Sequence, residues 1–125
     1  MLDSSAIIAM ILDEPGADIV AQNLGNAIVS MVNVAEVYAV ISRKIQNTRA
    51  ADAFFALRGV KPVPLSFEQA KSAGLYEDLG KIFGLSLGDR CCLALASETK
   101  AVALTADKTW VKFGPSANVE IRLIR

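Results

Sequence analysis

Histidine is absent from this chain of 125 residues, and cysteine occurs only twice. Without histidine there is no Ser-His-Asp or Cys-His nucleophile system and no zinc site that needs imidazole. The two cysteines, Cys91 and Cys92, are adjacent in an apolar stretch, where neighbouring helix residues do not easily form a disulfide. We therefore expect two buried thiols in a protein of a reducing compartment, the cytoplasm.

The chain also lacks net charge, since 13 basic residues balance 13 acidic ones. No overall electric field draws it to nucleic acid or to a membrane surface, so nucleic-acid binding would need a local basic surface. The apolar run at residues 6–12 has no basic leader and no cleavage site, so it does not predict a signal peptide. No run is long enough to span a membrane. With 53% hydrophobic residues, the length predicts one domain with a large core, residues 1–125.

Short apolar runs alternate with amphipathic stretches along the chain. We expect strands at residues 1–3, 27–32, 101–104 and 119–124, and an edge strand or connector at 60–66, which holds two prolines. We expect helices at residues 4–14, 17–24, 49–58 and 67–83, others that begin at Asn33 and Ser86, and one turn at 108–113. The helix that begins at Ser86 has no polar face along residues 91–96, so we expect it to be buried. The alternation predicts an α/β domain with a mainly parallel central sheet.

Four acids follow strands or stand in the first turns of helices: Asp3, Glu36, Asp89 and Asp107. Each has a structural explanation. Asp3 can cap the helix that follows it, and Asp107 the turn that follows it. Glu36 can complete a capping box with Asn33, and Asp89 one with Ser86. Ligands bind at the carboxyl ends of parallel strands, however, and we expect all four acids at that edge.

Four carboxylates in one cleft repel each other unless cations lie between them. Ligation by oxygen alone, without histidine or cysteine, selects hard ions such as Mg²⁺ or Mn²⁺. Such ions position a phosphodiester, activate water and stabilise the leaving oxygen. An enzyme without histidine can therefore hydrolyse RNA or DNA.

Five segments, in their order along the chain, resemble a PIN-domain ribonuclease: DSSA (residues 3–6), NVAEV (33–37), LSLGDRCCLALA (85–96), LTADKTW (104–110) and VEIRLIR (119–125). More narrowly, the chain is similar to the VapC-type toxins of VapBC toxin–antitoxin modules. The resemblance implies a three-layer α/β/α domain with a four- to five-stranded, mainly parallel sheet. It also implies Mg²⁺-dependent endonucleolytic cleavage of RNA, with Mn²⁺ as a substitute, and a small antitoxin protein as partner. The 53% hydrophobic content and the absence of net charge predict a homodimer.

The resemblance assigns catalysis and metal binding to Asp3, Glu36, Asp89 and Asp107, with the first and third as the most direct ligands. Ser5 and Thr105 match small hydroxyl positions beside the acids and would contact them, although capping and strand-end hydrogen bonds also explain these residues. Arg90 is the candidate for RNA contact. Only two residues precede Asp3, fewer than family members usually have, so we expect a short first strand or a natural start upstream of Met1.

Two other readings remain open. One is a non-catalytic PIN-like module that binds a partner or RNA; such a module is expected to lose one or more of the acids, and all four are present here. The other is a different Mg²⁺ enzyme on an α/β sheet, such as a phosphatase or a phospho-receiver domain. A DxD signature is missing because Ser5 stands two residues after Asp3, and no phosphate-binding glycine loop is present.

Overall fold

Five short segments of extended chain form the centre of the molecule. In the structure, a computed structural model that describes residues 1–125, the strands are β1 (Ala27–Ser30), β2 (Val60–Val63), β3 (Ala103–Thr105) and β4 (Ile121–Leu123). β1 pairs with β2 and β3 pairs with β4, both in parallel. Residues 1–3 join the two pairs through Leu2 N–H to Ile28 O, 2.9 Å, and Asp3 N–H to Leu104 O, 3.0 Å. The expected mainly parallel sheet is confirmed.

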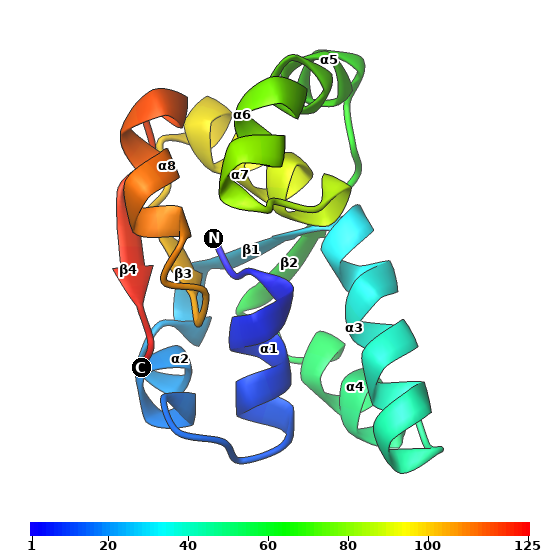
Figure 1. Ribbon diagram of the computed structural model, residues 1–125. Coiled ribbons are helices and arrows are strands. Elements are labelled where there is room, and N and C mark those ends of the chain that lie inside the picture. Colours follow the sequence, from blue (N-terminus) through cyan, green and yellow to red (C-terminus); the bar gives the residue numbers. More distant parts are fainter.

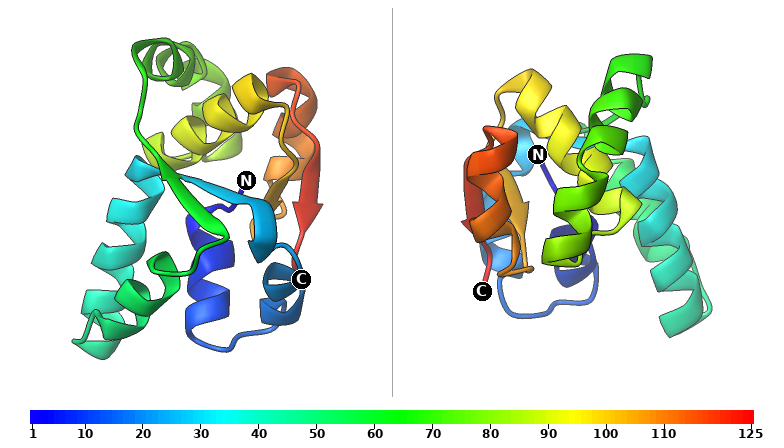
Figure 2. Two further views of the ribbon diagram at one scale, coloured as in Figure 1. Left: turned by 180° about the vertical axis from the view of Figure 1, so that it is seen from behind. Right: turned by 45° about the horizontal axis from the view of Figure 1, so that its top comes forward.

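Helices cover both faces of these strands. They are α1 (Ser4–Ile11), α2 (Ala17–Gln22), α3 (Met31–Ile45), α4 (Arg49–Phe55), α5 (Phe67–Leu75), α6 (Glu77–Phe83), α7 (Leu87–Thr99) and α8 (Trp110–Ala117), with a 3₁₀ turn, η1 (Leu24–Asn26), before β1. Figure 1 shows α1 to α4 in the lower half of the molecule and α5 to α8 in the upper half, with the strands between them. The views of Figure 2 show the same separation, and the α/β/α class is confirmed.

Side-chain alternation along the central strands divides the core between the two layers of helices. Leu2 and Leu104 belong to a cluster with the helices α1 to α4. Met1 and Ala103, their chain neighbours, belong to a second cluster with α7 and α8. Successive side chains of a strand point to opposite faces, so each strand residue serves one core or the other.

The helix that follows Ser86 is buried as expected, with all six residues from Cys91 to Ala96 inside the protein. Both thiols are free and buried. Trp110 and Phe113, at the start of α8, pack against the same helix and are fully buried. No helix combines the length and the apolar character that a membrane crossing requires.

The single helix expected at residues 67–83 is wrong, because two helices occupy this stretch. α5 ends at Tyr76, whose ψ of 2° leaves the helical range, and α6 begins at the next residue. The helical periodicity of the sequence continues across the break and conceals it. Gly80 has a packing role, since a Cβ there would lie 2.9 Å from Cδ of Arg90.

Several expected boundaries also move. Asp3 caps α1, and this helix ends at Ile11, before the expected residue 14. The strand expected at residues 27–32 ends at Ser30, because Met31 and Val32 already belong to α3. The turn expected at 108–113 is instead the two-turn helix α8. These shifts are small, but the early start of α3 at Met31 means that Asn33 lies inside the helix and does not cap it.

We predict that Leu93→Ala in α7 lowers the free energy of unfolding by about 2–5 kcal/mol, because Leu93 is fully buried and its truncation leaves a cavity. Leu87→Ala is the control, since that leucine at the start of the same helix is 57% exposed and the change should cost less than about 0.5 kcal/mol. Urea unfolding followed by circular dichroism measures both. Equal losses in the two variants would contradict the central position of α7.

Candidate active site

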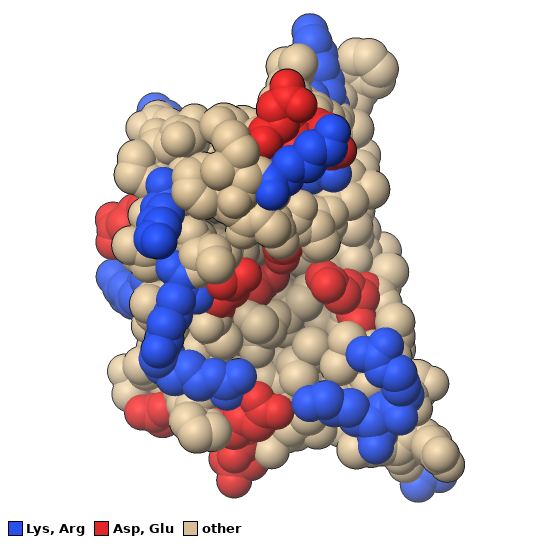
Figure 3. Space-filling view, in the orientation of Figure 1, with Lys and Arg blue, Asp and Glu red and all other residues tan.

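The four acids lie close enough for their charges to interact, although they come from four separate parts of the chain. Asp3 ends the central segment, Asp107 follows β3, Glu36 lies on α3 after β1, and Asp89 stands in the first turn of α7. Their charges affect one another: Asp89 raises the pKa of Asp3, and Glu36 and Asp107 raise that of Asp89. Figure 3 shows acidic side chains in a hollow at the middle of this face, with basic side chains along its borders.

Asp3 is the most buried of the four, with 3% of its surface exposed. Its Oδ2 accepts hydrogen bonds from Ser5 N–H (3.2 Å), Ser5 Oγ (2.6 Å) and Thr105 Oγ1 (2.9 Å). Its Oδ1 is buried and has no partner. Burial raises the pKa of this carboxyl to about 6, the Asp89 charge adds to the rise, and the hydrogen bonds from Ser5 and Thr105 oppose it.

Ser5 and Thr105 connect Asp3 to the loop that carries Asp107. Thr105 Oγ1 accepts the backbone N–H of Asp107 at 3.0 Å, and Ser5 Oγ accepts that of Ala106 at 2.9 Å. Each hydroxyl has a single proton, which it donates to Asp3. The structure thus brings both residues to the acids, and their part in activity stays a prediction.

Glu36 does not complete a capping box with Asn33, and this expectation is wrong. Ser30 caps α3, so Asn33 lies inside the first turn and is fully buried. The Oε2 of Glu36 instead accepts a hydrogen bond from the hydroxyl of Ser4, 2.6 Å away. The amide of Asn33 donates to the same hydroxyl at 2.9 Å. The nitrogen of this amide also lies 3.5 Å from Glu36 Oε2.

Asp89 and Asp107 do cap the chain, as their structural explanation predicted. Asp89 Oδ2 accepts the backbone N–H of Ser86 at 2.7 Å and completes a capping box. Asp107 Oδ1 accepts the backbone N–H and the hydroxyl of Thr109, both at 2.8 Å. Burial raises the pKa of Asp89, the hydrogen bonds from Ser86 lower it, and the charges of Glu36 and Asp107 raise it further.

One pattern is common to all four carboxylates. Each gives one oxygen to a hydrogen bond with the protein, and its other oxygen has no protein partner. Hydrogen bonds within the protein therefore account for one oxygen of each group. The four free oxygens make a donor set of the kind that hard divalent cations prefer, and the buried, unpaired Oδ1 of Asp3 is unfavourable without a cation or a proton.

The four acids do not form a ready-made metal cage. No group of three or more histidine, cysteine, aspartate or glutamate side chains is close enough to hold one metal ion. The donor chemistry fits a divalent cation, although in this structure no three of these side chains are close enough together to hold one ion.

Arg90, next to Asp89 in the sequence, is engaged elsewhere. Its guanidinium forms an ion pair with Glu77 of α6 and donates to the carbonyl of Ala73 in α5 at 3.2 Å, and its side chain is 12% exposed. The residue thus ties α5 and α6 to α7. Its contact with RNA stays a prediction.

Sequence reasoning missed Ser4 and Asn33, the two buried polar residues that contact Glu36. One signal was available for the second of them. Asn33, Val37 and Ile41 recur at four-residue spacing, and all three are buried on one side of α3. A polar residue on such an apolar stripe indicates a buried contact rather than a cap.

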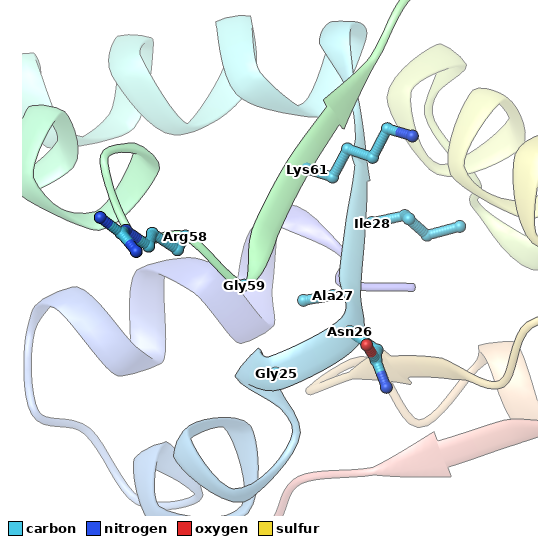
Figure 4. Close-up of a pocket in the computed structure, with 7 residues that line it drawn as sticks. All are labelled: Gly25, Asn26, Ala27, Ile28, Arg58, Gly59 and Lys61. Atoms are coloured by element: carbon cyan, nitrogen blue, oxygen red, sulfur yellow. The ribbon is translucent and has the colours of Figure 1, made fainter.

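A cavity of about 310 Å³ lies at the opposite edge of the sheet, where β1 and β2 begin. Figure 4 shows its lining: Gly25, Asn26, Ala27, Ile28, Arg58, Gly59 and Lys61. None of the four acids borders it, and we assign it no part in the chemistry.

The family model of the PIN domain matches residues 1–114, and no curated protein sequence matches the chain. Among the solved structures that resemble it is VapBC2 from Rickettsia felis, bound to a promoter DNA fragment, with a TM-score of 0.74 and 18% identity, covering 98% of this chain and 96% of that one. Another is DNA-bound VapBC from Salmonella typhimurium, with a TM-score of 0.73 and 13% identity, covering 100% and 97%. FitAcB from Neisseria gonorrhoeae has a TM-score of 0.65 and 18% identity, covering 96% and 94%. At these identities the likeness shows the fold.

We predict that the burial of Asp3 is visible in the pH dependence of stability without metal. Its pKa is about 6 in the folded protein against an ordinary value of 3.8, so the folded state binds more protons between these values. Stability should therefore fall as pH rises from about 4 to about 6, by about 3 kcal/mol from this group. Asp3→Asn removes the titration while its carbonyl oxygen can still accept the hydrogen bonds.

Urea unfolding of both proteins in EDTA, at several pH values between about 4 and 7, measures this difference. The unfolding free energy of the wild type should fall below that of Asp3→Asn progressively over the interval. A constant difference between the two proteins would show that Asp3 is not in the buried setting described above.

Proposed function

This chain belongs to the PIN domain family, whose model matches residues 1–114, and from that membership we propose that it is a metal-dependent endoribonuclease. PIN domains are generally nucleases. One observation carries the proposal for this chain: four carboxylates around one hollow each leave one oxygen without a protein partner. The reaction that fits such a site without histidine is hydrolysis of RNA phosphodiester bonds.

We propose Asp3 and Asp89 as the most direct metal ligands, with Glu36 and Asp107 completing the site directly or through water. Mg²⁺, or Mn²⁺ in its place, would supply activation of water and stabilisation of the leaving oxygen. The chain itself holds the ligands: Ser5 and Thr105 fix Oδ2 of Asp3, and the capping box fixes Oδ2 of Asp89. This support leaves Oδ1 of both groups available to a cation.

RNA would be held by basic side chains beside the hollow, because the chain as a whole carries no net charge. Figure 3 supports this arrangement with basic side chains bordering the acidic centre. Lys108, which is exposed and follows Asp107, is placed to contact a phosphate. Arg90 would need to leave Glu77 before it contacts RNA.

We further propose that the protein is the VapC-type toxin of a type II toxin–antitoxin system, acting in the cytoplasm. The fold shared with VapBC and FitAcB structures supports this, and the two free cysteines suit a reducing compartment. Its partner would be a small antitoxin that inserts a basic side chain among the acids. The alternative, a non-catalytic PIN-like module, has less support because none of the four acids is missing.

We expect the purified protein to cleave structured RNA with Mg²⁺ or Mn²⁺ and to be inactive in EDTA. Asp89→Asn should lose most of this activity, because it removes a ligand charge, while the amide oxygen can still cap α7 and stability stays close to that of the wild type. The matched control is Asp78→Asn, an exposed acid in the first turn of α6. Cleavage that continues undiminished in EDTA would contradict the proposed mechanism. So would an Asp78→Asn variant that loses as much activity as Asp89→Asn.

The protein should also form a homodimer. Three large apolar side chains of α5 and α6 are far more exposed than is usual in a monomer: Phe67 at 80%, Leu75 at 75% and Ile82 at 73%. Pairing would cover them, and a chain without net charge does not resist association. Light scattering at micromolar concentration measures the mass, and a monomer throughout would remove the dimer from the proposal.

A further inference from the structure

Glu36 lies in a cradle made by three residues to which no role in the site has been given: Ser4, Asn33 and Gly88. The polar side chains of Ser4 and Asn33 lie inside the protein, 4% and 0% exposed respectively. The three residues come from α1, α3 and α7, three helices that meet beside the acids. We propose that these residues are positioning residues, which set the place of the Glu36 carboxylate at the metal site.

The polar half of the cradle is a short chain of hydrogen bonds. The Asn33 amide donates to Ser4 Oγ at 2.9 Å, so the single proton of that hydroxyl is directed to Glu36 Oε2, 2.6 Å away. A hydrogen bond to a carboxylate is short and strong because the acceptor carries charge. It engages Oε2 alone, and Oε1 has no protein partner.

Packing does not explain Asn33. Its Oδ1 is buried without a hydrogen-bond partner, which is unfavourable, and an apolar residue would fill the same place without that cost. Its amide nitrogen instead lies within 3.5 Å of Ser4, Glu36 and the carbonyl of Gly88. Asn33 therefore serves the polar contacts of the cradle.

Gly88 contributes to the cradle because it has no side chain. A Cβ at this position would lie 2.9 Å from Glu36 Oε2. The backbone does not require glycine there, because only Gly16 and Gly84 among the glycines have positive φ. Alanine is also the stronger helix former in the first turn of α7. The space that a methyl group would take is the space that the Glu36 carboxylate uses.

The inference rests on the proposed function, and its test uses Mn²⁺ binding to the full chain as well as RNA cleavage. Ser4→Ala removes the hydrogen bond, whereas Gly88→Ala displaces the carboxylate without removing any polar group. Loss of a residue that orients a metal ligand typically weakens metal binding or activity 10–100-fold. We expect both variants to weaken Mn²⁺ binding by about tenfold or more and to lower kcat with little change in KM, because neither side chain reaches RNA.

Gly74→Ala is the matched control, a glycine in α5 with nothing within 4 Å of an added Cβ. It should leave Mn²⁺ affinity and cleavage unchanged. Gly88→Ala should unfold at the same temperature as the wild type or higher, since the only close atom is the end of a flexible side chain. Reduced metal affinity at undiminished stability is a result that a purely structural role would not give.

The decisive measurement is the change in Mn²⁺ affinity caused by Ser4→Ala in a protein that also carries Glu36→Gln. If Ser4 acts through Glu36, the change in Mn²⁺ affinity should shrink to less than about twofold there, as a coupled pair requires. An equal loss in both backgrounds overturns the inference, as do single variants that bind and cleave like the wild type. A wild type that neither binds Mn²⁺ nor cleaves RNA contradicts the proposed function itself, and the inference with it.

Discussion

The backbone hydrogen bonds of residues 1–3 are the interaction on which the rest of the structure depends. Leu2 bonds to β1 and Asp3 to β3, so this segment alone joins the two strand pairs. Its side chains also divide between the two cores, with Met1 on one face and Leu2 on the other. Because the segment ends beside the end of β3, Asp3 is placed at the carboxyl edge of the sheet, where it caps α1 and interacts with the charge of Asp89.

Repulsion between the carboxylates is offset by the residues that surround the site. Burial raises the pKa of Asp3 and of Asp89, and the charges of neighbouring acids raise both further. The protein responds with hydroxyl and backbone donors on one oxygen of every acid. These donors hold one oxygen of each group in place and leave the other without a protein partner.

The fold and the list of acids could be predicted from the sequence, because both depend on local signals. Strand and helix periodicity gave the α/β class, and strand ends marked Asp3 and Asp107. Roles decided by distant contacts could not be predicted. Asn33 follows a strand-like run and has an acid three residues later, as a cap does, and only its burial against α1 and α7 reveals otherwise. The guanidinium of Arg90 is likewise committed to Glu77, 13 positions earlier in the chain.

The central place of the first three residues has a consequence for synthesis. Asp3 is translated about a hundred residues before β3, its partner on one side. Asp89 and Asp107 also belong to the last third of the chain. A nascent chain can pair residues 1–3 with β1 early, but it lacks half of the acids until α7 and the loop after β3 have been made. Contacts of such long sequence separation also form slowly. A site built in this order is assembled only after the segments that carry Asp89 and Asp107 have been translated.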